Sequence, residues 1–288
     1  MKTLLITPSF GPDLHRCELL VESANRHVSG VDAHVLLIDR KELSLFKPLA
    51  GGRVQLVCKQ DLLPQWVFKC PGSRRWWLAL KTAPVRGWIL QQVVKLAVAE
   101  KLEADGYLYA DSDVVFVRPF DATRLWRGSD LRLFRSDRIE VMLESHRYLN
   151  WYRHAARYAG SQVPSNIQGG YIAQLNSLRR DRMLELFSAI ENASGKPWQQ
   201  ALLGTWDFSE YILYGAYAEY ARQFAGHYAD ERQICHSSWF YSIQNEADLQ
   251  RYLSRLEPHH VAVHIQSNLH ISTDTYRTMV SQLADQLG

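Results

Sequence analysis

The feature that most constrains the fold is an alternation of short apolar runs with helical segments along the first 120 residues. Runs rich in aliphatic residues at 4–7, 33–39 and 53–58 have the length of buried strands. Segment 13–27 carries apolar residues at helical spacing, and we expect Asp13 to cap it. This rhythm predicts a mostly parallel sheet covered by helices.

The same pattern continues around a buried helix and becomes less regular in the second half. A helix is predicted over 88–102, followed by strands at 107–111 and 114–117. Further on, the sequence predicts strands at 169–175 and 260–265 and helices at 177–191 and 208–221. Because neither repeats nor a linker interrupt the chain, we expect one domain over residues 1–288 with an elaborated C-terminal half.

Composition excludes several classes of protein. The 33 Lys and Arg against 30 Asp and Glu leave a net charge of +3, too small to predict a nucleic-acid partner. The sequence has no apolar run near the roughly 18 residues needed to span a bilayer, and the first residues resemble a strand more than a signal peptide. Four scattered cysteines without a CxxC pair favour reduced thiols. These features predict a cytoplasmic protein.

The most informative segment is the acidic turn Asp111-Ser112-Asp113 between two apolar strands. Two carboxylates two residues apart at a strand end repel each other unless a cation lies between them. Oxygen ligands of this kind suit a hard divalent ion such as Mg²⁺ or Mn²⁺, and ligands of open α/β sheets bind at the carboxyl ends of strands. An Asp-rich turn with only a structural role is the alternative.

The segment YLYADSDVVFVRPF around this turn resembles the DxD segment of the GT-A-type glycosyltransferases, which use nucleotide sugars. The Thr7-Pro8-Ser9 strand end, polar residues on the helix before the DxD, and His264 in a late strand agree with that resemblance. It implies a GT-A-like, Rossmann-like fold with a nucleotide-binding half at about 1–120 and an acceptor-side half at about 121–288.

The resemblance also implies the roles of individual residues. The metal, Mn²⁺ or Mg²⁺, is expected on Asp111, Asp113 and His264, and Lys95 is expected near the diphosphate of the donor. The predicted nucleotide-sugar contacts are Thr7, Pro8, Ser9, Asp39, Gln92, Lys95, Asp111, Ser112, Gly169 and Gly170. Purely structural alternatives stay open for several of these: a hydrogen-bonded strand histidine, a solvated helix lysine, and turns at Asp39 and at the two glycines.

An inverting enzyme needs a base that removes the proton of the acceptor hydroxyl. The start of the predicted helix at 208–221 offers Glu210, with Asp207 as the second candidate. Acidic residues there are also favoured by the helix dipole alone. A retaining enzyme needs no such base.

Aromatic and basic residues gather around Pro71-Gly72: Trp66, Arg74, Arg75, Trp76 and Trp77. They fit an acceptor sugar, an anionic membrane surface or, for some tryptophans, the core. The resemblance to the GT-A-type glycosyltransferases further implies a glycan or lipid-linked acceptor and a role in bacterial surface polysaccharide or lipopolysaccharide assembly. It also implies a cytoplasmic protein with peripheral contact to the inner membrane. The sequence leaves the donor, the acceptor, the stereochemistry and the oligomeric state open.

Two other functions are compatible with the sequence. A non-catalytic sugar-binding protein would have the same fold without a working metal centre. A phosphatase of the haloacid dehalogenase type also uses a DxD after an aliphatic strand, but there the motif normally opens the domain. A dinucleotide-binding enzyme is disfavoured because no GxGxxG follows the first strand.

Overall fold

The computed structural model describes residues 1–73, 76–137, 146–160, 169–266, 269 and 271–287. Within these residues the central element is a five-stranded sheet in the order β13-β8-β1-β3-β4. Its strands are β1 (Thr3–Pro8), β3 (Ala33–Ile38), β4 (Val54–Cys58), β8 (Gly106–Ala110) and β13 (Leu175–Arg179). The first four run parallel, and β13 pairs antiparallel with β8 at the edge.

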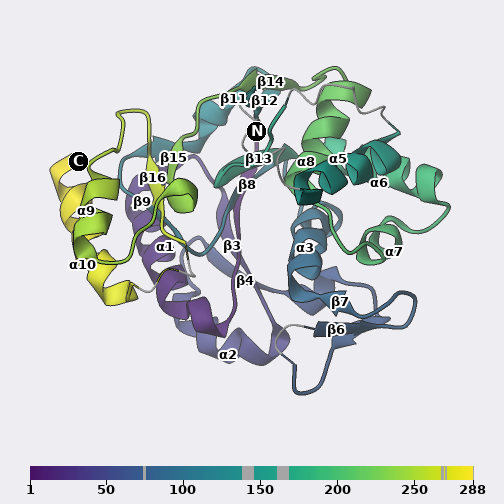
Figure 1. Ribbon diagram of the computed structural model, residues 1–288, viewed down its shortest axis with the longest axis horizontal. Helices are drawn as coiled ribbons and strands as arrows, with labels where there is room; N and C mark the ends of the chain where they lie inside the picture. Colours follow the sequence, from purple (N-terminus) through teal and green to yellow (C-terminus); the bar gives the residue numbers. More distant parts are fainter. Residues whose placement is uncertain (74–75, 138–145, 161–168, 267–268, 270, 288) are drawn as a thin grey trace.

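Helices cover both faces of this sheet (Figure 1). Alternate residues of β1 point to opposite sides: Ile6 packs into the cluster formed with α3 (Gly87–Lys101), and Leu5 into the cluster formed with α1 (Leu14–His27). Strands β1, β3 and β8 are buried along their whole length. Burial on both faces is why their sequences are mainly apolar and do not alternate apolar with polar residues.

The rest of the chain forms layers around this core. On the side of α3 lie α5 (His146–Ala159), α6 (Arg180–Ser194), α7 (Trp198–Leu203) and α8 (Glu210–Ala216), which continues as one π-helical turn, Tyr217–Ala221. On the side of α1 lie α9 (Glu246–Leu253) and α10 (Thr273–Leu287). The short helix α2 (Leu43–Phe46) follows β3.

Smaller sheets complete the fold. They are β15-β16-β9 (Cys235–Ser237, Ala262–His264, Val114–Phe116), β11-β12-β14 (Trp126–Arg127, Asp130–Phe134, His227–Asp230), β5-β6-β7 (Val67–Lys69, Trp76–Ala79, Val85–Arg86) and the pair β10-β2 (Phe120–Asp121, Val28–Ser29). The pairing of β16 with β9 brings the C-terminal part of the chain next to the acidic turn, because Val114 lies opposite His264.

The α/β fold with a mostly parallel central sheet is confirmed, but two predicted elements in the second half are wrong. Residues 169–174 are not a strand; β13 begins at Leu175, the last residue of the predicted strand. Residues 177–179, predicted as helix, belong to β13, and α6 begins only at Arg180. Pairing with β8 overrides the helical preference of this polar segment.

Asp13 does not cap α1 with its side chain, contrary to prediction. Among the described residues, none of the helices combines the length and apolar character that a membrane crossing requires.

Gly215 in α8 lies directly against the ring of Tyr171. A Cβ at this position would approach the ring carbons to 2.3 Å. We therefore expect Gly215→Ala to lower the free energy of unfolding by about 1–3 kcal/mol through overpacking, although alanine normally favours a helix. Urea unfolding measures this loss in the free energy of unfolding. In a Tyr171→Ala background the same substitution should be neutral or stabilising, and an equal loss in both backgrounds would exclude this contact as the cause.

His34 on β3 is fully buried, with its Nε2 2.9 Å from the hydroxyl of Thr7. Burial lowers the pKa of His34 to about 3. Because this lies below the unfolded value of about 6.5, the unfolded chain binds the proton first and stability falls as the pH drops below 6.5. From this shift alone we expect a loss of about 2 kcal/mol between pH 7.5 and pH 5.

Melting temperatures across this pH range provide the measurement. His34→Gln should flatten the profile. The matched control is His15→Gln, since His15 is 76% exposed, and it should leave the profile unchanged. If the wild type and His34→Gln lose stability in parallel as the pH falls, His34 is not the cause of the loss.

Candidate active site at the carboxyl ends of the central strands

The acidic turn follows β8 at the carboxyl end of the parallel strands, where an open α/β sheet binds its ligands. Its two aspartates have different partners. Asp111 contacts Lys95 of α3, with 2.9 Å between Oδ1 and Nζ. Asp113 contacts His264 of β16, with 3.4 Å between Oδ2 and Nε2. The turn therefore connects α3 on one side with the C-terminal sheet on the other.

Lys95 is the centre of a buried polar network. Its ammonium group lies 3.2 Å from Glu210 Oε1 and donates to the hydroxyl of Tyr211 at 3.2 Å. Burial acts to lower the pKa of Lys95, but Asp111, the Tyr211 hydroxyl and Glu210 around the ammonium group outweigh it and hold the pKa well above its usual value. The side chain is therefore a fixed cation inside the protein.

Glu210 is held in this network from two directions. Its side chain is 3% exposed, and its backbone N–H donates to Gln92 Oε1 at 3.2 Å. Burial raises the pKa of Glu210, and the nearby Lys95 offsets this in part. Two residues predicted as site residues on α3, Gln92 and Lys95, are thus brought together with the start of α8.

His264 is oriented by a second contact on its other ring nitrogen. The hydroxyl of Ser237 lies 3.2 Å from Nδ1, so Nε2 faces Asp113. Burial acts to raise the pKa of Asp113, but the hydrogen bond and charge of His264 leave it lowered. The predicted juxtaposition of Asp113 with His264 is present, and it depends on the pairing of β16 with β9.

Asp13 is a further acid at this position, and sequence reasoning treated it only as a helix cap. Its carboxylate hydrogen-bonds Ser112. Burial raises its pKa, as does the negative charge of Asp113. The two aspartates of the turn thus have two further acids beside them, Asp13 and Glu210. Four acidic side chains lie near one buried lysine.

A cleft of about 970 Å³ opens beside Asp13, over the ends of β1 and β3. Its lining combines aromatic, acidic and basic residues: Phe10, Gly11, Pro12, Asp39, Glu42, Lys59, Lys69, Trp76, Trp77, Arg86, Gly87, Trp88, Leu90 and Gln91. The size is that of a small-molecule site. Charged and polar groups beside aromatic rings are typical of sites that bind a nucleotide or a sugar.

Asp39, the residue predicted to bind the base or the ribose, lines this cleft and is 6% exposed. It accepts hydrogen bonds from the Lys41 backbone N–H and from Gln60, both at 3.1 Å, and it lies 3.4 Å from Lys69. Burial acts to raise its pKa, but these donors and Lys69 leave it lowered. The carboxylate is therefore a charged acceptor at the cleft.

Other predicted residues lie outside the DxD network. Thr7 is fully buried against His34, Pro8 ends β1, and the carbonyl of Ser9 accepts a hydrogen bond from Lys59 at 2.7 Å. Asp207 accepts from Trp151 Nε1 at 2.5 Å and from Arg147 at 3.2 Å, both on α5.

The two predicted glycines lie in a tyrosine-lined part of the core. The carbonyl of Gly169 accepts a hydrogen bond from Tyr152, and a Cβ at Gly169 would approach the Tyr171 hydroxyl to 2.9 Å. Gly170 forms a backbone bridge with Ser136. The preceding segment, residues 165–168, and Arg74 and Arg75 lie outside the described residues.

The donor atoms at the turn fit a divalent cation. Carboxylate oxygens and an imidazole nitrogen are the ligands that Mn²⁺ accepts, and the acidic excess favours a cation. Among the described residues, His, Cys, Asp and Glu side chains do not converge in a group of three that could hold a metal. Ions of this type commonly take one or two protein carboxylates and complete their shell with substrate phosphates and water.

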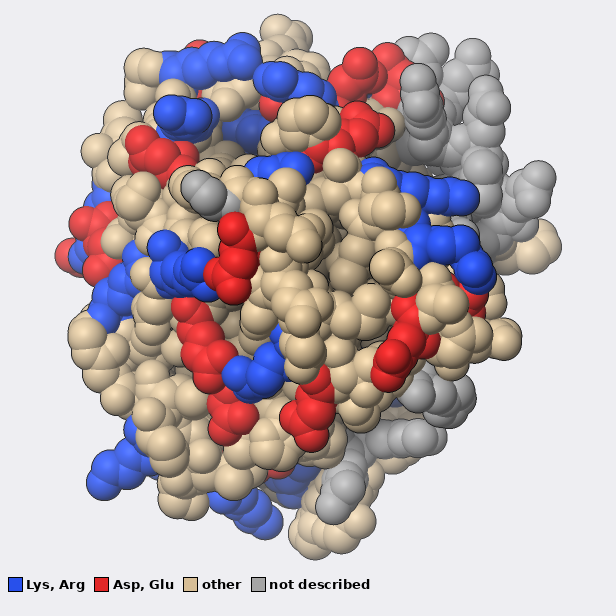
Figure 2. Space-filling view, turned by 90° about the vertical axis from the view of Figure 1, so that its left-hand side faces the viewer, with Lys and Arg blue, Asp and Glu red and all other residues tan. Residues whose placement is uncertain are grey.

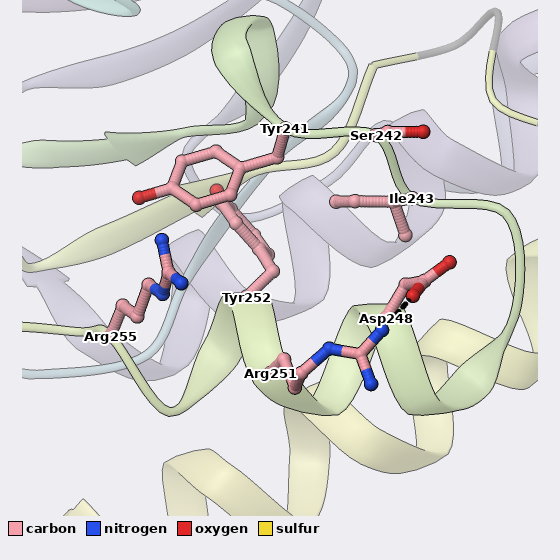
Figure 3. Close-up of a pocket in the computed structure, with 7 residues that line it drawn as sticks. All are labelled: Tyr241, Ser242, Ile243, Asp248, Arg251, Tyr252 and Arg255. Carbon is pink, nitrogen blue, oxygen red and sulfur yellow. Dashed lines mark hydrogen bonds and ion pairs between the residues drawn. The ribbon is translucent and has the colours of Figure 1, made fainter.

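A second, smaller cavity of about 170 Å³ lies between α9 and the segment before it. Figure 3 shows Tyr241 and Arg255 on one side of it and the Asp248–Arg251 ion pair on the other. The hydroxyl of Tyr252 is 2.9 Å from the carbonyl of His264. This cavity therefore lies behind the strand that carries His264.

Several site residues were missed at the sequence level. Lys59 directly follows β4 and Asp13 follows the first strand–turn segment, so the rule that ligands bind beyond the carboxyl ends of strands would have selected both. Tyr211 and Ser237 had no comparable signal, because only tertiary packing brings them to Lys95 and His264.

Glycosyltransferases are among the known structures that resemble this chain. The bifunctional glycosyltransferase WbbM, in its apo form, gives a TM-score of 0.54 at 10% identity over 98% of this chain and 51% of that chain. The galactosyltransferase LgtC with donor and acceptor sugar analogues gives 0.49 at 12% identity over 99% and 96%. Mouse xyloside xylosyltransferase 1 gives 0.49 at 11% identity over 94% and 100%.

The likeness to WbbM shows the fold alone, and the fold is the GT-A type predicted from the DxD segment. Residues 6–287 match the family described as "Family of unknown function (DUF6492)", and the chain belongs to that family. No curated protein matches the sequence.

Replacing Lys95 should lower the stability of the protein, because it leaves a buried carboxylate without its cation. Lys95→Met leaves the buried Glu210 carboxylate without its cation, and we expect a loss of about 3–5 kcal/mol in the free energy of unfolding. The additional change Glu210→Gln should recover part of it.

Urea unfolding of the purified variants measures these changes. Lys101→Met, at the exposed end of the same helix, is the matched control and should lie within about 0.5 kcal/mol of wild type. Equal stability of Lys95→Met and Lys101→Met would show that the Lys95 network contributes little to the free energy of unfolding.

Proposed function

We propose that the chain is a metal-dependent glycosyltransferase that moves a sugar from a nucleotide diphosphate sugar to a glycan or lipid-linked acceptor. The observation that carries this proposal is the acidic turn after β8, placed between Lys95 and His264. The 970 Å³ cleft reaches Pro12, the neighbour of Asp13, and the Asp13 carboxylate hydrogen-bonds Ser112 of the turn. Charged groups that suit a diphosphate and its cation thus lie beside a cavity with room for a nucleoside.

The donor is proposed to lie with its nucleoside in the cleft and its diphosphate toward the turn. Asp39 accepts hydrogen bonds from ribose or base, and the aromatic wall of Trp77 and Trp88 provides apolar contact. Lys59 and Lys69 supply positive charge along the same wall. The polar groups that recognise a nucleotide are then supplied by the ends of several neighbouring strands.

Asp113 and His264 are proposed to hold the divalent ion, with Asp111 at its outer side toward Lys95. When bound, such an ion neutralises the charge that develops on the departing diphosphate. The residues themselves fix the geometry: Ser237 holds the imidazole so that Nε2 faces Asp113, and Lys95 holds the Asp111 carboxylate. Preorganised charge of this kind costs little rearrangement during the reaction.

For Glu210 we propose a structural role in holding Lys95, because its carboxylate is paired with Lys95 and almost completely shielded from solvent. Asp207 is more accessible, at 24% exposed, and stays the candidate base if the enzyme inverts configuration. Replacing it would also release Arg147 and Trp151 of α5.

Thermal unfolding with UDP, GDP or CMP in the presence and absence of Mn²⁺ tests the proposal. The correct nucleotide at about 100 times its Kd should stabilise the protein by about 2.7 kcal/mol. In a chain of this size that corresponds to a rise in Tm of roughly 5 °C. We expect the rise to require the metal ion.

Asp113→Ala should lose the metal-dependent part of this shift and lower sugar transfer at least about 100-fold. Asp285→Ala, which removes an exposed carboxylate on α10, is the control and should behave as wild type. Equal shifts for both variants would remove Asp113 from the site. A metal-independent affinity for glycans alone would favour the sugar-binding protein, and phosphate release from a model ester would favour the phosphatase.

A further inference from the structure

The small antiparallel sheet β5-β6-β7 has one covered face and one bare face. Side chains that are paired across the strands point to the same side. Val67, Trp77 and Val85 form the covered side and are 2–6% exposed. Phe68, Trp76, Leu78 and Arg86 form the opposite side, which together with Leu80 and Trp206 we call the β5–β7 face.

Large apolar side chains are unusually exposed on the β5–β7 face. Leu80 is 77% exposed, Trp206 55%, Phe68 41% and Trp76 36%. Trp206 joins the face through an edge-on contact with Trp76, with 6.3 Å between ring centroids. Single exposed apolar residues are normal, but a group of them on one surface marks a site of interaction.

The charged residues in the chain segment that forms this sheet are all basic. The sequence has no Asp or Glu between Asp61 and Glu100, while lysines and arginines occur throughout that stretch. The Arg86 guanidinium lies 5.1 Å from the Trp206 ring centroid and 6.0 Å from that of Trp76. Lys81 lies 5.9 Å from the Trp66 ring. Within the described residues, the ion pairs do not include Arg86 or Lys81.

The face over α1, α9 and α10 is different. Figure 2 shows Lys and Arg interspersed with Asp and Glu there. Several of its cations are paired with acids, as in Arg26–Asp285, Arg277–Glu22 and Arg251–Asp248. Such a mixed surface has no net attraction for an anionic partner, whereas the β5–β7 face has unpaired positive charge beside exposed tryptophans.

We propose that the β5–β7 face docks on an anionic phospholipid bilayer. Tryptophan rings lie at the boundary between headgroups and acyl chains, and lysine and arginine bind the anionic headgroups. Leu80 and Phe68 would enter the acyl region, while Lys81 and Arg86 stay at headgroup level. A saccharide partner would use the aromatic rings, but it would leave the highly exposed Leu80 without a function.

The same strands form part of the cleft wall, since Trp76 and Arg86 line it. Docking would therefore place the mouth of the cleft beside the headgroups. That a lipid-linked acceptor enters there rests on the proposed function, whereas the docking itself does not. Vesicle binding without any donor tests the docking separately from sugar transfer.

Co-sedimentation of the full chain with extruded vesicles provides the test. We expect binding to vesicles of phosphatidylglycerol and phosphatidylcholine, little binding to pure phosphatidylcholine, and weakening as salt is raised. Lys81→Glu should weaken binding to the anionic vesicles about fivefold or more. Leu80→Ser and Phe68→Ser should also weaken it severalfold.

Matched controls use residues of the same type on other surfaces. Lys101→Glu is the control for charge, and Leu45→Ser, at a leucine 45% exposed on α2, is the control for apolar area. Tm values confirm that each variant is folded. The proposal is overturned if wild type does not bind the anionic vesicles, if neutral vesicles bind equally well, or if the variants of the β5–β7 face match their controls.

Discussion

The buried ammonium group of Lys95 is the interaction on which the site depends. It lies within 3.2 Å of Asp111, Glu210 and Tyr211, and so connects α3, the turn after β8 and the start of α8. A charge in this position is tolerated only because carboxylates surround it, and the carboxylates are tolerated only because it is there. Tyr109 of β8 also donates to the Lys95 carbonyl at 2.7 Å, which fixes the helix against the strand.

This network gives the two aspartates of the turn different environments. Asp111 faces a permanent cation, whereas Asp113 faces His264, whose ring is held by Ser237. In the proposed reaction this division leaves Asp113 and His264 for the metal ion and gives Asp111 a fixed orientation. The cleft beside the turn and the β5–β7 face beyond it share Trp76 and Arg86. Donor binding and membrane docking, both proposed here, would therefore involve neighbouring surfaces of one wall.

Much of the fold could be predicted because its central strands are buried on both faces. Runs such as 4–7 and 33–39 are mostly aliphatic and do not alternate apolar with polar residues, as expected for strands covered by helices on both sides. The second half was less predictable. Residues 175–179 combine two leucines with three polar residues, and they form β13 because β8 offers an open edge rather than through their own preference. The prediction that residues 1–288 form one domain stays a prediction.

The sequence by itself determined the acidic turn and the apolar strand before it, because both are encoded by adjacent residues. On that basis a divalent cation and a nucleotide sugar are predicted at this edge of the sheet, and both stay predictions. Only the tertiary structure decided the partners of each carboxylate. Lys95, Glu210 and His264 are distant along the chain from the turn or from one another, and the pairing of β16 with β9 and the packing of α8 on α3 bring them together. Long-range pairing of this kind leaves no local periodicity in the sequence, so no local pattern could have predicted it.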